Sequence, residues 1–270
     1  MPAFNDTAET GEVPHRGNFP RFLALLLLAV LSVRSFACAP FTIPSESMLP
    51  TLQNGDYLVA AKWPYGYSRY SLPFNAPLIS GKLFPHLPQR GDVAIFRHAS
   101  DGAEYVKRVI GLPGDIVSMR NGALVLNGQP VPRQRIADFR IAQSPNTPCA
   151  WGAVRETGPQ GSVICRYVRY RETLPGGRSY DVLDFGATPQ DRYGPMTVPG
   201  GYVFVLGDNR DNSQDSRFPA RPGGGVGLVP ASLLVARAGL VLFSSDGSAV
   251  WYDPLSWIAA TRWHRMGERI

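Results

Sequence analysis

The sequence predicts a mainly β fold: antiparallel β-sheets with a smaller inserted β subdomain, preceded by one apolar N-terminal segment. Its 28 glycines and 25 prolines in 270 residues exceed what a helical protein would tolerate. Short runs of β-branched and aromatic residues recur along the chain, each bounded by turn-forming residues. Asn121-Gly122 and Asn127-Gly128 supply the positive-φ pairs that tight hairpins need. With 44% hydrophobic residues, the chain is long enough for one large domain or two smaller ones.

The N-terminal region divides into a polar tail and an apolar segment. Residues 1–18 have little apolar content and are expected to form a disordered cytoplasmic tail. The run "FLALLLLAVLSV", Phe22–Val33, follows and is flanked by Arg21 and Arg34. Its clean apolar length is short for a membrane span, which needs about 20 residues, and fits a signal-peptide core better.

Other features decide between a cleavable signal and an anchor. "ACA" at Ala37–Ala39 has the small-x-small form of a signal cleavage site. Pro40 directly after that site disfavours cleavage, and apolar character continues to Phe41. Arg16 and Arg21 precede the segment and favour a cytoplasmic N-terminus. Hydropathy alone favours the cleavable signal; the alternative is a single transmembrane anchor over residues 19–39.

The rest of the chain is expected to be β core around an insertion. Residues 40–119 and 200–270 are assigned to the core, and the irregular, proline-punctuated residues 120–199 to the inserted subdomain. Leu233–Phe243 is too short and too charged to cross a membrane and is expected to be a strand. Pro254–Ile270 is expected to hold a short helix with its tryptophans, Trp257 and Trp263, packed inward or toward lipid. The other predicted strands are Asp56–Ala61, Asp92–His98, Glu104–Gly111, Asp115–Met119, Ala123–Asn127 and Gly201–Gly207.

Charge and cysteine usage limit the partners. The net charge is +6, but the basic residues are scattered and form no run of five or six, which argues against nucleic acid and favours an anionic membrane surface. Cys38, Cys149 and Cys165 have no C-x-x-C spacing, and the four histidines are dispersed, so no metal site is expected. Cys149 and Cys165 close a short polar loop: they either form a disulfide outside the cytoplasm or stay unpaired.

Three stretches carry residues suited to catalysis. "PSESMLPTL", Pro44–Leu52, presents two hydroxyls two residues apart, and a hydroxyl becomes a nucleophile only when a base removes its proton. His98 is one candidate base, although the sequence shows no obvious acid to orient it. Lys107 is the other: it interrupts a strand otherwise made for burial, and alternation places it opposite Arg108. A strand-edge lysine that reaches solvent is the ordinary alternative.

The third stretch is "GDNRDNSQDSR", Gly207–Arg217, which follows a predicted strand. It has neither helical nor strand periodicity, so it is either a solvated turn or a hydrogen-bonded scaffold for a site. A calcium loop is disfavoured because the glycine and terminal glutamate of an EF-hand are missing.

Four motifs occur in a fixed order after the hydrophobic segment: "IPSESMLPTL", "RGDVAIF", "YVKRVIGLPGD" and "GDNRDNSQDSR". Together they resemble bacterial type I signal peptidases, the membrane-anchored leader peptidases of the serine–lysine class. The resemblance covers residues 40 to about 120 and 200 to 245, while the intervening region matches that family's variable subdomain by position only. The best-known members have two membrane spans, whereas this chain has one candidate.

The resemblance implies a division of labour. Ser47 is expected to be the nucleophile and Lys107 its neutral general base. Ser45 and Ser47 are expected to lie on one extended stretch, where the Ser45 hydroxyl and the Ser47 N–H form an oxyanion hole. Ser213 is expected to hydrogen-bond Lys107 and orient its amine. Asp215 and Arg217 are expected to form a structural ion pair. The substrate pockets, shallow and apolar for the small residues of an A-x-A site, are expected to be lined by Phe41, Ile43, Pro44, Met48, Leu52, Tyr105 and Val106.

The implied activity is removal of signal peptides from exported preproteins, without a cofactor or a metal. The implied location is the bacterial inner membrane, single-pass, with the catalytic domain on the extracytoplasmic side. The implied partners are signal peptides, which would add a β-strand near Ile43 and Tyr105, together with membrane lipids and the secretion translocon, and no nucleic acid. The alternatives are a relative that processes one dedicated pilin, and a membrane-anchored β-rich binding module that has lost activity.

The resemblance also changes the interpretation of the apolar segment. Ser47 lies about eleven residues beyond Phe36, at most about 36 Å of extended chain. An uncleaved anchor would therefore keep the serine near the outer membrane surface, and a cleaved form would lose that tether. The anchor is favoured on this ground, and self-cleavage at Ala37–Ala39 stays a hypothesis.

Overall fold

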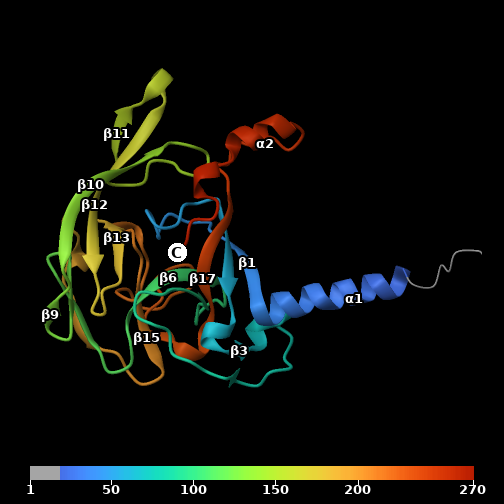
Figure 1. Cartoon of the computed structure of the whole chain (residues 1–270). Helices are drawn as coiled ribbons and strands as arrows, with labels where there is room; N and C mark the ends of the chain where they lie inside the picture. Colours follow the sequence, from blue (N-terminus) through green and yellow to red (C-terminus); the bar gives the residue numbers. More distant parts are fainter. Residues whose placement is uncertain (1–18) are drawn as a thin grey trace, which may run out of the picture.

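The computed structural model describes residues 19–270; the tail expected over residues 1–18 lies outside them. The described chain begins with helix α1, Phe19–Ser32, which continues as the π-helical segment η1, Val33–Ala37. The continuous helix Phe19–Ala37 is long and apolar enough to cross a membrane, and only 6% of its apolar window is buried in the protein. Figure 1 shows α1 projecting from the body as a separate arm.

The helix ends earlier than the predicted anchor. Cys38 and Ala39 belong to strand β1, Cys38–Thr42, where they pair with Ala61 and Ala60. The change from helix to strand occurs at Cys38, whose backbone is extended. The assignment of residues 38 and 39 to the anchor is therefore wrong, because the body's first β-ladder already includes them.

A seven-stranded antiparallel sheet forms the main body, and the predicted mainly β class is confirmed. Its strands run in the order β1-β2-β17-β5-β6-β15-β16. The strands predicted for the core lie in it, except the one predicted over Asp115–Met119. Runs of β-branched and aromatic residues favour such a half-buried pleated surface. Besides β1, its strands are β2 (Asp56–Ala61), β17 (Leu234–Ser244), β5 (Val93–Arg97), β6 (Glu104–Gly111), β15 (Tyr202–Leu206) and β16 (Val229–Pro230).

The inserted region builds two four-stranded sheets. It is more regular than the sequence suggested, because β10 and β12 are 10 and 11 residues long. Asn121 and Asn127 adopt positive φ and form turns with Gly122 and Gly128, as predicted. The strands are β7 (Ile116–Arg120), β8 (Ala123–Leu126), β9 (Gln129–Pro130) and β14 (Tyr193–Thr197) in one sheet, and β10 (Arg133–Ala142), β11 (Val154–Thr157), β12 (Val163–Thr173) and β13 (Ser179–Leu183) in the other.

The predicted boundary of the insertion needs a shift. Strand β7 was assigned to the core, but it pairs with β8 and β14 of the smaller sheet. The insertion therefore starts near Ile116 rather than at residue 120. One hydrophobic cluster joins the two parts, since Ile110, Phe204 and Leu206 of the main sheet pack with Val117 and Leu124.

Short elements complete the chain. The predicted C-terminal helix is α2, Pro254–Ala260. Trp257 and Trp263 are 53% and 60% exposed, so the inward packing expected as one option does not occur. The remaining elements are strands β3 (Tyr67–Ser68) and β4 (Lys82–Leu83) and the 3-10 turns η2 (Trp63–Tyr65), η3 (Arg69–Ser71), η4 (Pro73–Asn75), η5 (Pro159–Gly161), η6 (Pro189–Asp191), η7 (Arg210–Asn212), η8 (Ala231–Leu233) and η9 (Trp263–Arg265).

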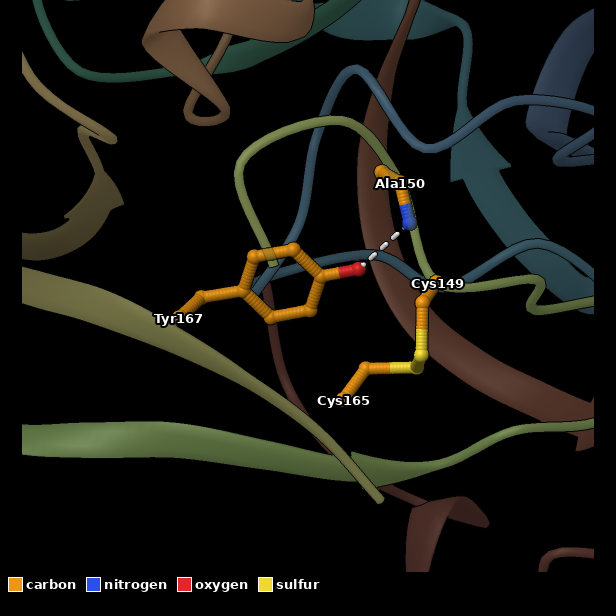
Figure 2. The surroundings of a disulfide bond; sticks show 4 residues. All are labelled: Cys149, Ala150, Cys165 and Tyr167. Carbon is orange, nitrogen blue, oxygen red and sulfur yellow. Dashed lines mark hydrogen bonds between the residues drawn. A yellow bond between two sulfur atoms is a disulfide. The ribbon is translucent and has the colours of Figure 1, made fainter. Parts of the chain in front are cut away.

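Cys149 and Cys165 form a disulfide, which decides between the two alternatives left open above (Figure 2). The bond ties the loop before β11 to strand β12, and Cys165 is fully buried. Next to it the Ala150 N–H donates to the Tyr167 hydroxyl at 2.9 Å, so the loop is held by two links. Cys38 is a free thiol.

Removing the disulfide should destabilise the protein. The bond closes a loop across 16 residues, and in the chain-entropy account such a cross-link contributes about 3 kcal/mol. The double variant Cys149→Ser/Cys165→Ser should therefore lose about 3 kcal/mol of unfolding free energy in urea titrations under oxidising conditions. Cys38→Ser is the matched control and should unfold as the parent does. Equal stability of the double variant and the parent would contradict the prediction.

Candidate active site

Ser47 lies on a tight turn directly after β1. The Leu49 N–H donates to the Glu46 carbonyl at 3.1 Å, and the Leu52 N–H to the Met48 carbonyl at 2.9 Å. The stretch is thus a turn and not the extended segment that was expected. It forms because Met48, Leu49 and Leu52 are all buried, which fixes the backbone on the core and leaves Ser47 facing the cavity.

Lys107 meets Ser47 across 60 residues of sequence. It lies in β6, is 4% exposed, and its Nζ lies 2.6 Å from Ser47 Oγ. The solvent-exposed alternative is therefore wrong. Ser45 Oγ lies 3.2 Å from Ser47 Oγ, so both hydroxyls are within reach of one small group. Arg108 occupies the opposite face of β6, as alternation predicts, and binds Asp208 through Nη2 at 2.6 Å.

The surroundings of Lys107 favour a neutral amine. Burial lowers the pKa of Lys107 to about 8, and the opposing effects of Asp215 and Asp208 do not cancel it. Each carboxylate already has a guanidinium of its own: Arg108 for Asp208, and Arg217 at 2.9 Å for Asp215. Because these acids are paired elsewhere, the lysine gains little from their charge.

Asp215 and Arg217 form a fully buried ion pair within the 207–217 loop. Burial would raise the pKa of Asp215, but Arg217 and the N–H donors of Gly207 and Arg217 more than offset this and hold that pKa below its ordinary value. The same carboxylate accepts from the Gly207 N–H at 3.1 Å, which closes the loop. The solvated-turn alternative is therefore wrong, and the stretch is a hydrogen-bonded scaffold.

Ser213 does not make the hydrogen bond expected of it. Its Oγ is buried and has no hydrogen-bond partner among the described residues, while Lys107 Nζ donates to Ser47. Ser213 packs against Gly207, where a Cβ atom would lie 2.2 Å from its Oγ and 2.5 Å from the Ser47 carbonyl oxygen. The Ser213 hydroxyl is therefore next to the Ser47 backbone and has an unused donor.

A cavity of about 360 Å³ opens beside the two serines and the lysine. Leu52 is not part of it, contrary to expectation, because this side chain is fully buried in the core with Leu58 and Val93. Several residues that line the cavity were not predicted from the sequence. Asn212 and Gln214 belong to the scaffold loop, and the glycine-rich stretch around Gly223 and Gly224 was the signal that could have indicated these two residues. The expected lining residues that do contribute are Phe41, Ile43, Pro44, Met48, Tyr105 and Val106, and those missed include Thr42, Ile95, Glu104, Asn212, Gln214, Gly223 and Gly224.

His98 is excluded as the base by its contacts. Its Nε2 lies 3.1 Å from the Gly225 carbonyl oxygen, and its Nδ1 lies 3.0 Å from the Asp101 carboxylate. The ring stacks on Tyr105 with the centroids 4.7 Å apart. This histidine does have an acidic neighbour, which the sequence did not reveal, and its ring nitrogens face Gly225 and Asp101 rather than Ser47.

A buried amine contacts a serine hydroxyl beside a cavity, and this arrangement is suited to acyl transfer. Comparison with known proteins places the chain among peptidases. Residues 16–243 match the family model described as signal peptidase, peptidase S26. This match covers most of the chain, which therefore belongs to that family. The chain is a peptide-bond hydrolase whose family removes signal peptides.

Individual relatives agree with this assignment. The chain is 34% identical over 240 residues to Signal peptidase I of Rickettsia canadensis (strain McKiel), which covers 85% of this chain and 80% of the relative. It is 34% identical over 245 residues to Signal peptidase I of Rickettsia typhi (strain ATCC VR-144 / Wilmington), over 87% of this chain and 82% of the relative. A solved signal peptidase I from Enterococcus faecalis V583 shares 25% identity over 56% of this chain and 97% of that chain; its TM-score of 0.31 is too low to support a structural argument.

Gly207 should tolerate no side chain. In Gly207→Ala the added Cβ would clash with Ser213 and with the Ser47 carbonyl oxygen, so the turn that contains Ser47 would have to move. We expect a loss of about 1 to 3 kcal/mol of unfolding free energy, the usual cost of overpacking, together with reduced peptidase activity. Gly200→Ala is the matched control, since nothing lies within 4 Å of its Cβ position. Full activity and stability in Gly207→Ala would refute the described packing.

Proposed function

We propose that the protein is a membrane-bound serine endopeptidase that cleaves signal peptides from exported preproteins after small-x-small sites, with Ser47 as nucleophile and Lys107 as neutral general base. The observation that carries this proposal is the 2.6 Å contact between Lys107 Nζ and Ser47 Oγ. That distance lies in the range required for direct proton transfer. With a pKa of about 8, about a tenth of the lysine is neutral at pH 7, compared with about one part in 3,000 at the ordinary value of 10.5.

The proposed reaction has two halves. Lys107 accepts the Ser47 proton as Oγ attacks the scissile carbonyl carbon, and the resulting ammonium then gives that proton to the leaving amine. The acyl group stays on Ser47, and the mature protein's N-terminus departs. A water molecule then attacks the ester, again with Lys107 as base, and releases the signal peptide's carboxylate. Ser213 Oγ has no hydrogen-bond partner among the described residues. Once bound substrate rearranges the site, the Ser213 hydroxyl would donate a hydrogen bond within it.

The developing oxyanion needs donors. The Ser47 N–H makes no hydrogen bond to any residue in the described part of the chain, and Ser45 Oγ lies 3.2 Å from Ser47 Oγ. Both are assigned to the oxyanion hole. Removing one such donor from a hydrolase typically costs about 3 to 4 kcal/mol of transition-state stabilisation.

The cavity and the sheet edge support the substrate assignment. The space of about 360 Å³ beside Ser47 is bounded by Phe41, Ile43 and Tyr105, whose apolar surfaces can contact the apolar side chains of a small-x-small site. Strand β1 stands at the end of the strand order in the main sheet, so its outer edge is free to pair with an extended peptide. Alternating side chains of that peptide would then enter the cavity, as an A-x-A site requires.

Helix α1 supports attachment to the membrane. Ser47 follows the end of the helix, Ala37, by ten residues, which span at most about 36 Å. Retention of α1 as an anchor therefore keeps the serine near the membrane surface where signal peptides emerge. The Cys149–Cys165 disulfide favours an oxidising compartment, and so the extracytoplasmic side of the bacterial inner membrane, next to the secretion translocon.

Removal of either proposed catalytic group should abolish cleavage. Ser47→Ala and Lys107→Ala should each lower kcat for a preprotein with an A-x-A site by about 10⁴-fold or more. The control is Lys82→Met. Burial also lowers the pKa of Lys82 to about 8, but its Nζ donates hydrogen bonds to the backbone carbonyls of Ala231 and Leu234. That variant should lose stability and keep its kcat at 25 °C. Substantial cleavage by either of the first two variants would rule out the dyad.

The pH dependence should follow Lys107. The base works only when neutral, and its pKa is lowered to about 8. Activity should therefore rise about tenfold per pH unit up to that value and level off above it. Initial rates of kcat/KM between about pH 5.5 and 9.5 measure this. A flat profile over that range would show that no group with this pKa acts as the base.

A further inference from the structure

A second cavity, of about 190 Å³, lies where α1 joins the body; we refer to it as the α1 cavity. Three cationic side chains from separate elements line it: Arg34 from η1, Lys62 just after β2, and Arg97 at the end of β5. Glu104 is the acidic residue in its lining. Nothing in the proposed reaction uses this group of charges.

The positive charge in the α1 cavity is not balanced. Glu104 pairs with Arg97 at 2.9 Å. Arg34 and Lys62 have no ion-pair partner in the part of the chain that the structure describes. Lys62 is only 5% exposed, and burial first and the neighbouring Arg34 second lower its pKa to about 8. A buried cation beside a second cation is unfavourable unless an anion joins them.

The α1 cavity also keeps unused hydrogen-bond donors. Lys62 Nζ donates to the Ser71 carbonyl at 2.8 Å, which occupies one of its three protons. Arg97 Nε is buried without a partner, although other nitrogens of that guanidinium bind Glu104 and the Gly102 carbonyl. Free donors with a net positive charge are what a phosphate group with several acceptor oxygens requires.

The position of the α1 cavity, at the end of the apolar helix, indicates which kind of anion would bind there. Arg34 lies three residues before the end of the apolar helix at Ala37, the depth at which an anchored helix leaves the hydrocarbon and meets lipid headgroups. Exposed aromatic residues surround this end of the helix: Phe74 is fully exposed, and Trp63 and Phe36 are 56% and 49% exposed. Such side chains are typical of the membrane interface. In Figure 1 the segment around β3 lies beside the base of α1.

We infer that the α1 cavity binds the phosphate of an anionic phospholipid headgroup through Arg34, Lys62 and Arg97, an inference that rests on the proposed membrane anchoring of α1. Phe41 and Glu104 line both this cavity and the substrate cavity. A lipid bound there would therefore brace one wall of the substrate cavity. The site would tie substrate binding to the state of the membrane.

The test uses the full chain in vesicles of phosphatidylcholine, with and without phosphatidylglycerol. Phosphatidylglycerol should raise the Tm of the parent by about 3 °C and lower KM for a preprotein, because a ligand that binds only the folded state stabilises it. Lys62→Met and Arg34→Gln should lose most of this increment, whatever their Tm in phosphatidylcholine. Arg120→Gln, an exposed arginine on the distant strand β7, is the matched control and should keep it.

Three outcomes would overturn the inference. The first is an unchanged increment in Lys62→Met and Arg34→Gln, and the second is an equal loss in Arg120→Gln, which would indicate general surface charge. The third is the same increment from inorganic phosphate added to phosphatidylcholine vesicles, which would assign the site to a free anion. Carbonate extraction separates the two proposals: a chain that washes out of the vesicles overturns the anchor as well, whereas an embedded chain without an increment overturns only the lipid site.

Discussion

Burial of Lys107 against Ser47 is the constraint on which the rest of the site depends. An ammonium on this strand would lose its hydration and gain little from Asp208 and Asp215, because Arg108 and Arg217 already neutralise those carboxylates. The protein thus contains two compensated ion pairs around one uncompensated amine. A lysine in such surroundings releases its proton near neutral pH, which makes it fit to accept one from a hydroxyl.

The inserted subdomain contributes to this arrangement from a distance. Glu172 of β12 binds Arg210 of the scaffold loop through Nη1 at 2.9 Å, and both side chains are almost completely buried. The Leu183 N–H of β13 donates to the Asp208 carbonyl at 2.9 Å. The loop that supports the Ser47 turn is therefore held by strands of the insertion sheet that contains β12 and β13. Since breaking a buried ion pair leaves an uncompensated charge, the insertion specifies the geometry of the site as well as covering the core.

The two ends of the substrate cavity carry different chemistry. The cavity beside Ser47 combines apolar walls, among them Ile43, Met48 and Tyr105, with polar groups of the Ser47 turn and of the scaffold loop. Toward α1 the same wall, through Phe41 and Glu104, meets the cationic α1 cavity. The wall that Phe41 and Glu104 form is thus common to the α1 cavity and the cavity beside Ser47.

Much of the protein follows from local sequence patterns. β-Branched runs bounded by glycine and proline determine the core strands, and the Asn-Gly pairs determine two hairpin turns. The ordered motifs identify the family and single out Ser47 and Lys107 as the residues proposed for catalysis. These signals are readable because strand propensity and turn geometry depend on adjacent residues. The long strands of the insertion were not predicted, since charged residues interrupt their apolar alternation. Some of these residues are exposed, as Arg135 and Arg171 are, whereas Glu172 is buried in an ion pair.

Only the tertiary structure decided which groups meet. Pairing of β6 with β5 and β15 buries Lys107 and aims it at a turn 60 residues away, and no local pattern encodes that distance. Tertiary packing also removes Leu52 from the cavity beside Ser47 and leaves Ser213 Oγ without a hydrogen-bond partner among the described residues. Within the insertion it brings Cys149 to Cys165. The sequence by itself determined which residues are able to do the chemistry. Long-range burial, which sums contacts from many strands, determined where they lie and lowered the pKa of Lys107.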